Sequence, residues 1–324
     1  MQVLVTGGAG YVGSVVCRRL LSHGHGVRVL DSLMYGGASI LGLSHDDRFS
    51  FVRGDLRSKD TVVSALEGMD AVVHLAAIVG DPACARQPAL AREVNHEASL
   101  KLFELCRRQE GIQRFVFAST CSNYGRMTDL SSYLTEDSEL RPVSLYAETK
   151  VAVERALLQA ACEQSPVVTI LRFATAFGLS PRMRFDLTVN EFTMELLTKR
   201  KVTIYGEQFW RPYLHVVDIA EAVRLTLEAP ATLVHGQAFN VGDTTQNYQK
   251  GRLAELICEQ IGDDCRIERI QKAEDPRDYR VRFDKVAHTL GFRISRPVEA
   301  GVREIIEAIT HGIVTDVEDA RYRN

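Results

Sequence analysis

Tyr146 and Lys150 are the residues whose types and spacing most directly suggest chemistry. They stand four positions apart, so a helix places them on one face. A phenol loses its proton near pH ~10 in water, and an adjacent ammonium stabilises the phenolate. The pair therefore predicts a tyrosine that acts as a general base. The same spacing also occurs on solvated helix faces, so the pair alone does not establish an active site.

A loop rich in hydroxyl groups follows a predicted buried strand and runs from Ser119 to Gly125. A hydroxyl on this loop is suited to hydrogen-bond the oxygen atom that reacts. An ordinary Ser/Thr turn is the alternative explanation. Together with the tyrosine and the lysine, the loop favours catalysis over a purely structural role.

Three glycines, Gly7, Gly10 and Gly13, follow the first predicted strand and open the first predicted helix. This spacing lets the backbone turn tightly and approach a pyrophosphate, which the helix N-terminus favours. Asp31 ends the next strand, where a carboxylate can accept hydrogen bonds from ribose hydroxyls and repel a 2′-phosphate. The pattern predicts NAD in preference to NADP. A simple turn residue is the alternative role for Asp31.

Two further segments are expected beside the cofactor. Asp55 and Leu56 follow the third strand, where the carboxylate of Asp55 either meets the adenine amino group or caps the next helix. Leu75, Ala76 and Ala77 end the fourth strand with small residues that let a cofactor lie close.

The elements that must position these residues alternate between short β-branched runs and helical patterns. The predicted strands are Val3–Thr6, Val27–Asp31, Ser50–Arg53, Ala71–Leu75, Arg114–Ala118 and Val167–Phe173, and the predicted helices between them are Tyr11–Ser22, Thr61–Leu66, Leu90–Arg108 and Tyr146–Gln164. Most of these strands lack polar alternation, as parallel strands covered on both faces do. The order predicts an α/β fold with a Rossmann doubly wound parallel sheet. Its ligands are expected beyond the carboxyl ends of the strands.

After Gly178 the alternation loosens, which predicts a smaller C-terminal α/β domain. The elements expected after Gly178 are helices at Leu187–Thr198, Val217–Glu228, Arg252–Ile261 and Val298–Thr310, and strands at Val202–Tyr205 and Phe239–Gly242. We expect residues 1–175 and about 213–242 to form the NAD-binding domain. Residues 176–212 and about 243–324 are expected to form the substrate-binding domain. The polar tail after Gly312 is expected to be mobile.

Composition excludes several other classes of protein. The formal charge of −3 leaves no basic footprint for nucleic acid. No apolar run approaches the roughly 20 residues that span a bilayer, and glycines follow the first strand where a signal peptide would continue. Scattered cysteines without a Cys-x-x-Cys pair argue against a disulfide framework or structural zinc. The cytoplasm is the expected location. Histidines such as His74 and His215 show no metal-ligand spacing and are expected to pack or cap.

The motifs together resemble those of the extended short-chain dehydrogenase/reductases of the nucleotide-sugar epimerase/dehydratase family, over nearly the whole chain. The matching residues are the three glycines, Asp31, Asp55-Leu56, Ser119-Thr120, Tyr146-x-x-x-Lys150, Leu171-Arg172-Phe173, residues 211–216 and Phe239-Asn240-Val241-Gly242. The resemblance implies that Thr120 is the catalytic hydroxyl residue, that Lys150 also holds the nicotinamide ribose and that Asn95 braces the active-site helix. It adds Tyr11, Val12, Ser32, Ser119 and Phe173 to the cofactor site. The family's dehydratases carry Asp-Glu directly after the catalytic threonine, whereas this chain has Cys121-Ser122, which disfavours 4,6-dehydration.

The expected substrate is a nucleotide-diphosphate sugar. Guanidinium groups bind phosphate oxygens bidentately, and the resemblance assigns this role to Arg211 and Arg277. Arg182 and Arg184 have either this role or surface ion pairs. Other residues expected on the substrate side are Cys121, Ser122, Asn190 and Thr175, which stands where the family usually has asparagine. The segments 180–187 and 275–279 resemble a branch that includes GDP-heptose C4 dehydrogenases.

The expected reaction is oxidation at C4 of an NDP-hexose or NDP-heptose, with Tyr146 taking the hydroxyl proton. If the hydride returns to the other face of the sugar, the enzyme is a 4-epimerase, which is the preferred interpretation. A C4 dehydrogenase, a 4-ketoreductase and a non-catalytic NAD-binding regulatory protein remain alternatives. The resemblance also implies a homodimer, paired through the helices at Leu90–Arg108 and Tyr146–Gln164.

Overall fold

Seven parallel strands form the main sheet, in the order β10-β6-β5-β4-β1-β2-β3. The computed structural model describes residues 1–127, 132–161, 166–262, 264–272 and 277–324. The strands are β1 (Gln2–Thr6), β2 (Gly26–Asp31), β3 (Phe49–Arg53), β4 (Ala71–His74), β5 (Arg114–Thr120), β6 (Val167–Phe173) and β10 (Gln237–Val241). The strand order reverses between β1 and β4, which is where such sheets bind their ligands. The predicted Rossmann arrangement is confirmed.

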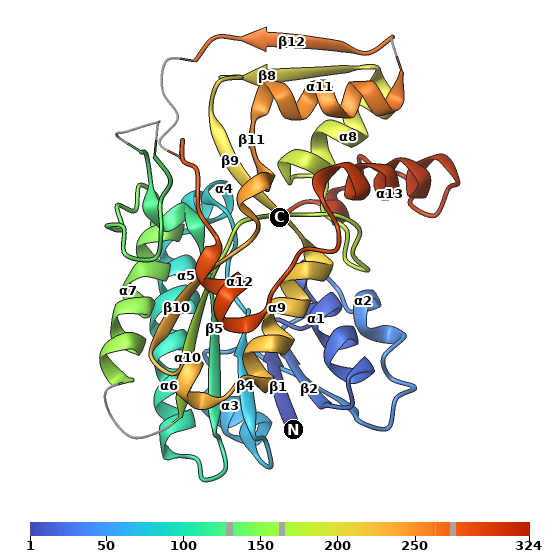
Figure 1. Ribbon diagram of the computed structural model, residues 1–324. Coiled ribbons are helices and arrows are strands. Elements are labelled where there is room, and N and C mark those ends of the chain that lie inside the picture. Colours follow the sequence, from blue (N-terminus) through green and yellow to red (C-terminus); the bar gives the residue numbers. More distant parts are fainter. Residues whose placement is uncertain (128–131, 162–165, 263, 273–276) are drawn as a thin grey trace.

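Helices cover both faces of this sheet (Figure 1). One face carries α1 (Tyr11–Ser22) and α9 (Val216–Glu228), and the other carries α3 (Lys59–Leu66), α6 (Ser99–Arg108) and α7 (Leu145–Ala160). In β1, Val3 and Val5 pack with α1 and α9, whereas Leu4 packs with the helices opposite. Because successive strand side chains point to opposite faces, burial on both sides explains why β1 has no polar alternation.

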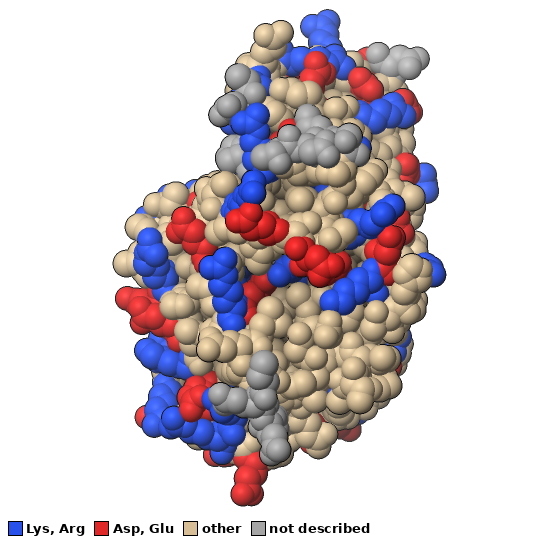
Figure 2. Space-filling model, turned by 60° about the vertical axis from the view of Figure 1, so that its left-hand side comes forward, with Lys and Arg blue, Asp and Glu red and all other residues tan. Residues whose placement is uncertain are grey.

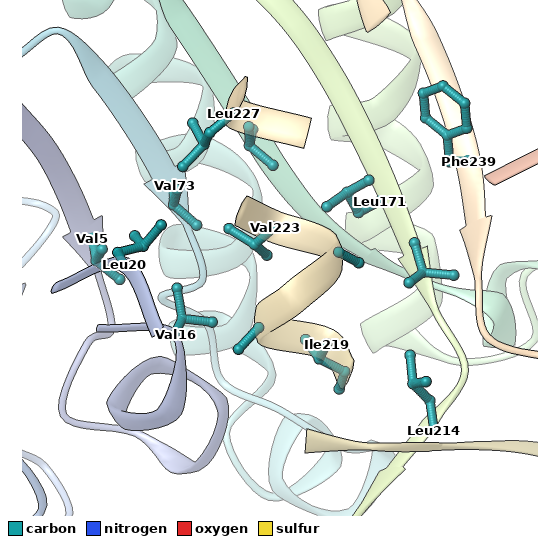
Figure 3. Close-up of a cluster of buried hydrophobic side chains, with 14 of the residues drawn as sticks. Val5, Val16, Leu20, Val73, Leu171, Leu214, Ile219, Val223, Leu227 and Phe239 are labelled. Atoms are coloured by element: carbon teal, nitrogen blue, oxygen red, sulfur yellow. The ribbon is translucent and has the colours of Figure 1, made fainter. Parts of the chain in front are cut away.

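Helix α9 brings residues from late in the chain into the first core. Ile219 and Val223 point into a cluster formed by α1 and the strands (Figure 3). The cluster around them contains Val5, Val16, Leu20, Val73, Leu171, Leu214, Leu227 and Phe239. Each of these side chains is almost completely buried. The NAD-binding half of the molecule therefore depends on a helix that follows part of the smaller lobe.

The smaller lobe stands beyond the carboxyl ends of the main strands (Figure 1). Its strands are β7 (Thr175–Phe177), β9 (Trp210–His215) and β11 (Asn247–Gln249) in one sheet, and β8 (Lys201–Tyr205) and β12 (Arg266–Ile270) in another. Its main helices are α8 (Thr188–Lys199), α11 (Lys250–Ile261) and α13 (Val298–Thr310). These helices share an apolar core that includes Phe192, Leu253 and Val302.

The predicted helix Leu90–Arg108 is divided into three elements. Helix α5 (Pro88–Arg92) is followed by a π-helical segment, Glu93–Ala98, and then by α6. The π-helix contains Asn95, whose side chain bonds a neighbouring loop, and such π-segments are often found at functional sites. The predicted end of the next helix, Gln164, lies outside the described residues. The remaining short helices are α2 (Ala38–Leu41), α4 (Asp81–Arg86), α10 (Ala231–Val234) and α12 (Asp284–Leu290).

Strand pairing and packing cross the expected domain boundaries at two places. Strand β9 pairs with β7 and β11 and not with the main sheet, although its Leu214 packs into the core of the main sheet. Helix α12 packs against β10, because Val286 and the neighbouring Phe283 and Phe292 join the core of the main sheet. A segment of the supposed second domain therefore completes the first.

The C-terminal tail was expected to be mobile, and this was wrong. The ring of Tyr322 packs edge-on against Phe185, with 5.5 Å between centroids. The backbone N–H of Phe185 donates to the carbonyl of Tyr322 at 2.9 Å. Val314 and Val317 also pack on this cluster. A few apolar side chains in a polar stretch are sufficient to attach the tail between the two lobes, where Figure 1 shows the C-terminus.

Charged side chains of both signs are intermingled over the described part of the face in Figure 2. This distribution agrees with the near-neutral formal charge of −3. Within the described ranges, no helix combines the length and apolar character needed to cross a membrane.

Gly13 is a position where a single methyl group should disturb the fold. A Cβ at Gly13 would lie 2.1 Å from the carbonyl oxygen of Gly7 and 2.7 Å from the Cα of Gly8. We expect Gly13→Ala to lower the free energy of unfolding by about 1–3 kcal/mol, as overpacking does, measured by urea denaturation. Gly42→Ala is the matched control, because the nearest described atom to its Cβ is the Nη2 of Arg18 at 3.4 Å. Equal stability of the two variants would contradict the close packing of this turn.

Candidate active site

A pocket of about 480 Å³ opens at the carboxyl ends of the central strands, between the two lobes. Most residues predicted for cofactor and substrate line it. They are Gly7, Gly10, Tyr11, Val12, Gly13, Asp31, Ser32, Asp55, Leu56, Leu75, Ala76, Ala77, Ser119, Thr120, Ser122, Tyr146, Lys150, Phe173, Thr175, Arg182, Arg184, Arg211 and Arg277. The structure thus brings together residues that are more than 200 positions apart in sequence.

The glycine-rich turn forms a cradle at the N-terminus of α1. Gly7 has a φ of +73°, and a Cβ there would lie 2.8 Å from the backbone of Ala76. Gly10 is the N-cap residue, and no side chain caps the first turn of α1. The helix N-terminus carries partial positive charge, so an anionic group fits here in place of a capping side chain.

Asp31 stands at the edge of this cradle. Its carboxylate accepts hydrogen bonds from the N–H of Ala9 at 3.0 Å and of Leu33 at 2.8 Å. Burial raises the pKa of this carboxyl above its usual value. The two backbone bonds fix the carboxylate and leave it lone pairs for a ribose. The turn and Asp31 together fit an adenosine dinucleotide.

Asp55 is held by Arg57 and does not cap the following helix. The guanidinium of Arg57 donates to both carboxylate oxygens, at 3.0 and 2.8 Å. These bonds lower the pKa of Asp55. The N-cap position of α3 is Ser58, so the capping role considered for Asp55 was wrong.

Tyr146 and Lys150 lie in the first two turns of α7. Ser144, the N-cap residue, accepts a hydrogen bond from the N–H of Ala147 at 3.3 Å and so fixes the start of the helix. The ammonium of Lys150 lies 5.9 Å from the centroid of the Tyr146 ring and donates to the carbonyl of Ala118 at 2.9 Å. This second contact joins the helix to the end of β5, which carries the hydroxyl-rich loop.

Burial acts on the pKa values of both members of this pair. Burial raises the pKa of Tyr146, and a charge from Arg184 opposes the increase only in part. Burial also lowers the pKa of Lys150 to about 8. Desolvation disfavours the charged form of either group.

The hydroxyl-rich loop presents two of its four hydroxyls as a pair. The Oγ atoms of Thr120 and Ser122 are 2.8 Å apart, and Thr120 also accepts from the N–H of Ser122 at 3.1 Å. Both residues line the pocket. Ser119 instead donates to the carboxylate of Glu154 on α7. The loop is therefore anchored at one end and presents hydroxyls at the other.

A buried ion pair between Glu154 and Arg172 holds this loop in place. Arg172 donates from Nε and Nη2 to one Glu154 oxygen, at 3.1 and 2.9 Å, and both side chains are nearly inaccessible. Its Nη1 donates to the hydroxyl of Tyr124 at 2.9 Å, and Asn123 donates to Glu154 at 2.8 Å. The Glu154 charge also raises the pKa of Lys150 against the effect of burial.

The four predicted arginines lie in two groups. Arg182 and Arg184 belong to the loop between β7 and α8, and Arg184 forms a bidentate pair with Asp186, at 2.9 and 2.7 Å. The guanidinium of Arg211 lies 5.3 Å from the centroid of the Tyr279 ring, and Arg277 precedes Tyr279 by two residues. Arg277 pairs with Asp81 at 3.1 Å. Two other residues of the motif that contains Arg277, Asp275 and Pro276, lie outside the described residues.

Three predicted residues do not line the pocket. Asn95 donates to and accepts from the backbone of Ile78, so it braces the loop after β4 and not the active-site helix. Asn190 is fully buried and bonds the backbone of Gly178 and Arg184. Cys121 is fully buried, with its thiol directed at the carbonyl of Arg172. All three are therefore positioning or packing residues.

The histidines have the packing and capping roles expected of them. His74 contacts Thr6 and Ser99, and burial lowers its pKa to about 3, so it is neutral. His215 accepts from the N–H of Val217 at the start of α9 and pairs with Glu304 at 3.1 Å.

Several pocket residues were not predicted. They include Tyr35, Asp81, Lys250, Tyr279 and Asn324. Tyr279 lay within a motif recognised only for its arginine. The others stand in loops, at a helix start or in the tail, where no periodic pattern marks them.

Comparison with known proteins completes this description. The sequence profile of the NAD-dependent epimerase/dehydratase family matches residues 3–242, well over half of the chain. The chain belongs to this family. Its predicted cofactor, NAD, and its assignment as an enzyme of the extended short-chain dehydrogenase/reductase type are thereby confirmed.

Relatives within the family differ in reaction. The chain is 34% identical, over 75% of its length and 77% of the other protein, to YtcB of Bacillus subtilis strain 168, described as an uncharacterized UDP-glucose epimerase. It is 29% identical, over 95% of its length and 92% of the other protein, to dTDP-glucose 4,6-dehydratase of Streptomyces niveus. The structure of a UDP-glucose 4-epimerase of Thermotoga maritima with UDP-glucose superimposes with a TM-score of 0.85, at 26% identity, covering 97% of this chain and 100% of that one. Residues of the site, and not overall similarity, must therefore distinguish the reactions.

The Glu154–Arg172 pair gives a stability prediction for this family member. Glu154→Gln leaves the guanidinium buried without its counter-charge, so we expect the free energy of unfolding to fall by about 3–5 kcal/mol. Urea denaturation of full-length protein measures this. Glu148→Gln, an exposed change on the same helix, is the control and should cost less than ~1 kcal/mol. A similar small cost for both variants would show that the pair does not hold the site together.

Proposed function

We propose that this protein is an NAD-dependent 4-epimerase of an NDP-hexose or NDP-heptose. The observation that carries the proposal is the convergence of Thr120, Tyr146 and Lys150 on one pocket with the glycine-rich turn. An NAD-binding regulatory protein has no need of a tyrosine, a lysine and a hydroxyl at the end of the cofactor pocket.

The proton chemistry follows from these side chains. Tyr146 takes the proton of the C4 hydroxyl, and Thr120, with Ser122, orients the oxygen. Lys150 stabilises the phenolate, while its bond to Ala118 keeps the ammonium in place. NAD, when bound, supplies the hydride acceptor and the positive charge of its nicotinamide ring. After the keto sugar has rotated in the pocket to present its other face, Tyr146 returns the proton to the same oxygen.

The acids available in the pocket argue against dehydration. Among the described residues, the carboxylates that line it are Asp31, Asp55 and Asp81. Asp55 is paired with Arg57, and Asp81 with Arg277. Beside Thr120, where dehydratases of the family carry Asp-Glu, stand a buried cysteine and a serine. No carboxylic acid there protonates a leaving hydroxyl.

The nucleotide sugar is proposed to lie between Tyr146 and the second arginine group. Arg211 and Arg277 are suited to bind its diphosphate bidentately, and both line the pocket together with Tyr279. Arg277 would exchange its pairing with Asp81 for the phosphates. Thr175 lines the same pocket and offers the sugar a hydroxyl.

The test is incubation of the purified protein with GDP-, UDP-, dTDP-, CDP- and ADP-sugars, after mass spectrometry of any resident cofactor. Conversion of one sugar without a change in mass, and without free NADH, is expected. A product lighter by two hydrogens, with NADH formed, would make the protein a C4 dehydrogenase. Absence of turnover with every sugar would favour the regulatory protein.

Tyr146→Phe tests the proposed base. Removing one hydroxyl should lower turnover by more than about 100-fold, because general acid–base catalysis contributes that much. The NAD content of the purified variant should stay the same. Tyr205→Phe, an exposed change on β8, is the control and should behave as wild type. Full activity of Tyr146→Phe would exclude the proposed mechanism.

We also propose that the protein forms a homodimer through α6 and α7, which lie side by side on one outer face. A groove of about 390 Å³ between α3 and α6 is available for a second copy, and its lining is both apolar and charged: Leu56, Arg57, Lys59, Val62, Leu100, Lys101, Leu102, Glu104 and Leu105. Light scattering should give twice the 36.1 kDa of one chain. Leu105→Glu should give monomers, whereas Leu233→Glu, an exposed change on α10, should not. A monomeric wild type would refute this assembly.

A further inference from the structure

The loop between β7 and α8 is fixed on the first turn of α1. The hydroxyl of Ser180 donates to the carbonyl of Tyr11 at 2.7 Å. The hydroxyl of Tyr11 donates to the carbonyl of Gly178 at 2.7 Å. These reciprocal bonds hold a segment of the smaller lobe over the cradle formed by the glycine-rich turn.

Arg182 follows directly in this loop, and its guanidinium is incompletely bonded. The residue is 6% exposed, and its Nη2 donates to the carbonyl of Arg323 at 2.9 Å. Its Nε and Nη1 are buried and have no hydrogen-bond partner among the described residues. Leaving buried donors unsatisfied is costly, and more so for a charged group. Such a group in a pocket indicates a missing acceptor.

The position of Arg182 identifies the kind of acceptor. Its guanidinium lies 4.3 Å from the centroid of the Tyr35 ring. Tyr35 belongs to the loop that follows Asp31, on the adenosine side of the pocket. Arg182 thus bridges the loop over α1 and the loop beyond β2. The space between these loops is where the turn offers backbone N–H groups to an anion.

Arg182 is available to bind this anion and Arg184 is not, because Arg184 is already paired with a carboxylate. The carboxylate of Asp186 is already taken by Arg184 through two hydrogen bonds. The turn itself contributes N–H groups and no cation, whereas a pyrophosphate carries two negative charges. The guanidinium fork matches two phosphate oxygens.

We propose that Arg182 binds the pyrophosphate of the dinucleotide from the side opposite the helix N-terminus, and so retains the cofactor between turnovers. Arg182 was expected either to bind the diphosphate of the sugar or to form a surface ion pair, and this proposal replaces both alternatives. The inference extends the proposed function, since an epimerase returns the hydride to the same substrate and has no need to release its cofactor.

The experiment compares two ligands that differ by the diphosphate group. ADP and adenosine are titrated calorimetrically into full-length wild type, Arg182→Gln and Arg182→Lys, each freed of nucleotide by charcoal. We expect Arg182→Gln to weaken ADP binding by about 10- to 100-fold, the usual effect of losing hydrogen bonds to a charged group. Adenosine binding should change less than about twofold. Arg182→Lys should fall between the two, because it keeps the charge and loses the fork.

Arg86→Gln is the control for the tail, since Arg86 donates to the carbonyl of Asn324 at 2.8 Å. It should leave both affinities unchanged.

Equal losses of affinity for ADP and for adenosine in Arg182→Gln would mean that the residue only shapes the loop, and would overturn the proposal. Unchanged ADP binding together with a higher KM for the nucleotide sugar would indicate that Arg182 binds the substrate, and would also overturn the proposal. ADP binding requires no turnover, so a different reaction in the sugar assay would leave this result intact. Faster NAD release from Arg182→Gln than from wild type should accompany the loss of ADP affinity.

Discussion

The buried ion pair between Glu154 and Arg172 is the interaction on which the geometry of the site depends. It links α7, which carries the tyrosine and lysine, to β6 and to the hydroxyl-rich loop after β5. Two charges removed from water stabilise a fold only when their remaining hydrogen-bonding capacity is used. Here Ser119, Asn123 and Tyr124 use it. Breaking any part of this network would separate the base from the hydroxyl that must orient its substrate.

Sequence reasoning succeeded where the local pattern and the tertiary environment impose the same requirement. The glycine spacing, Asp31 at a strand end and the unbroken apolar strands each have one structural solution, so the sheet and the cofactor cradle could be predicted. Helix α1, strand β6 and helix α13 have the predicted bounds. The tyrosine and the lysine also lie on one helical face in the pocket, as their spacing required.

The failures came from interactions that no local pattern encodes. The sequence of β9 gives no sign that this strand belongs to a separate sheet. Only its pairing with β7 and β11 shows that it is part of the smaller sheet. The tail is polar in composition but is attached by Tyr322 and two valines. Asn95 and Asn190 were recognised as special, yet their side chains serve the backbone beside the pocket.

The late position of β10 has a consequence for how the chain is made. This strand ends at Val241 of 324 residues, and it pairs with β6 at the border of the main sheet. Helix α9, which covers one face, emerges just before it. A ribosome must therefore synthesise nearly three quarters of these 324 residues before the seven-stranded sheet is complete, and until then β6 offers an unpaired edge. Contacts so distant in sequence fold slowly. Nascent chains of this enzyme should consequently depend on chaperones during the interval between synthesis of β6 and synthesis of β10.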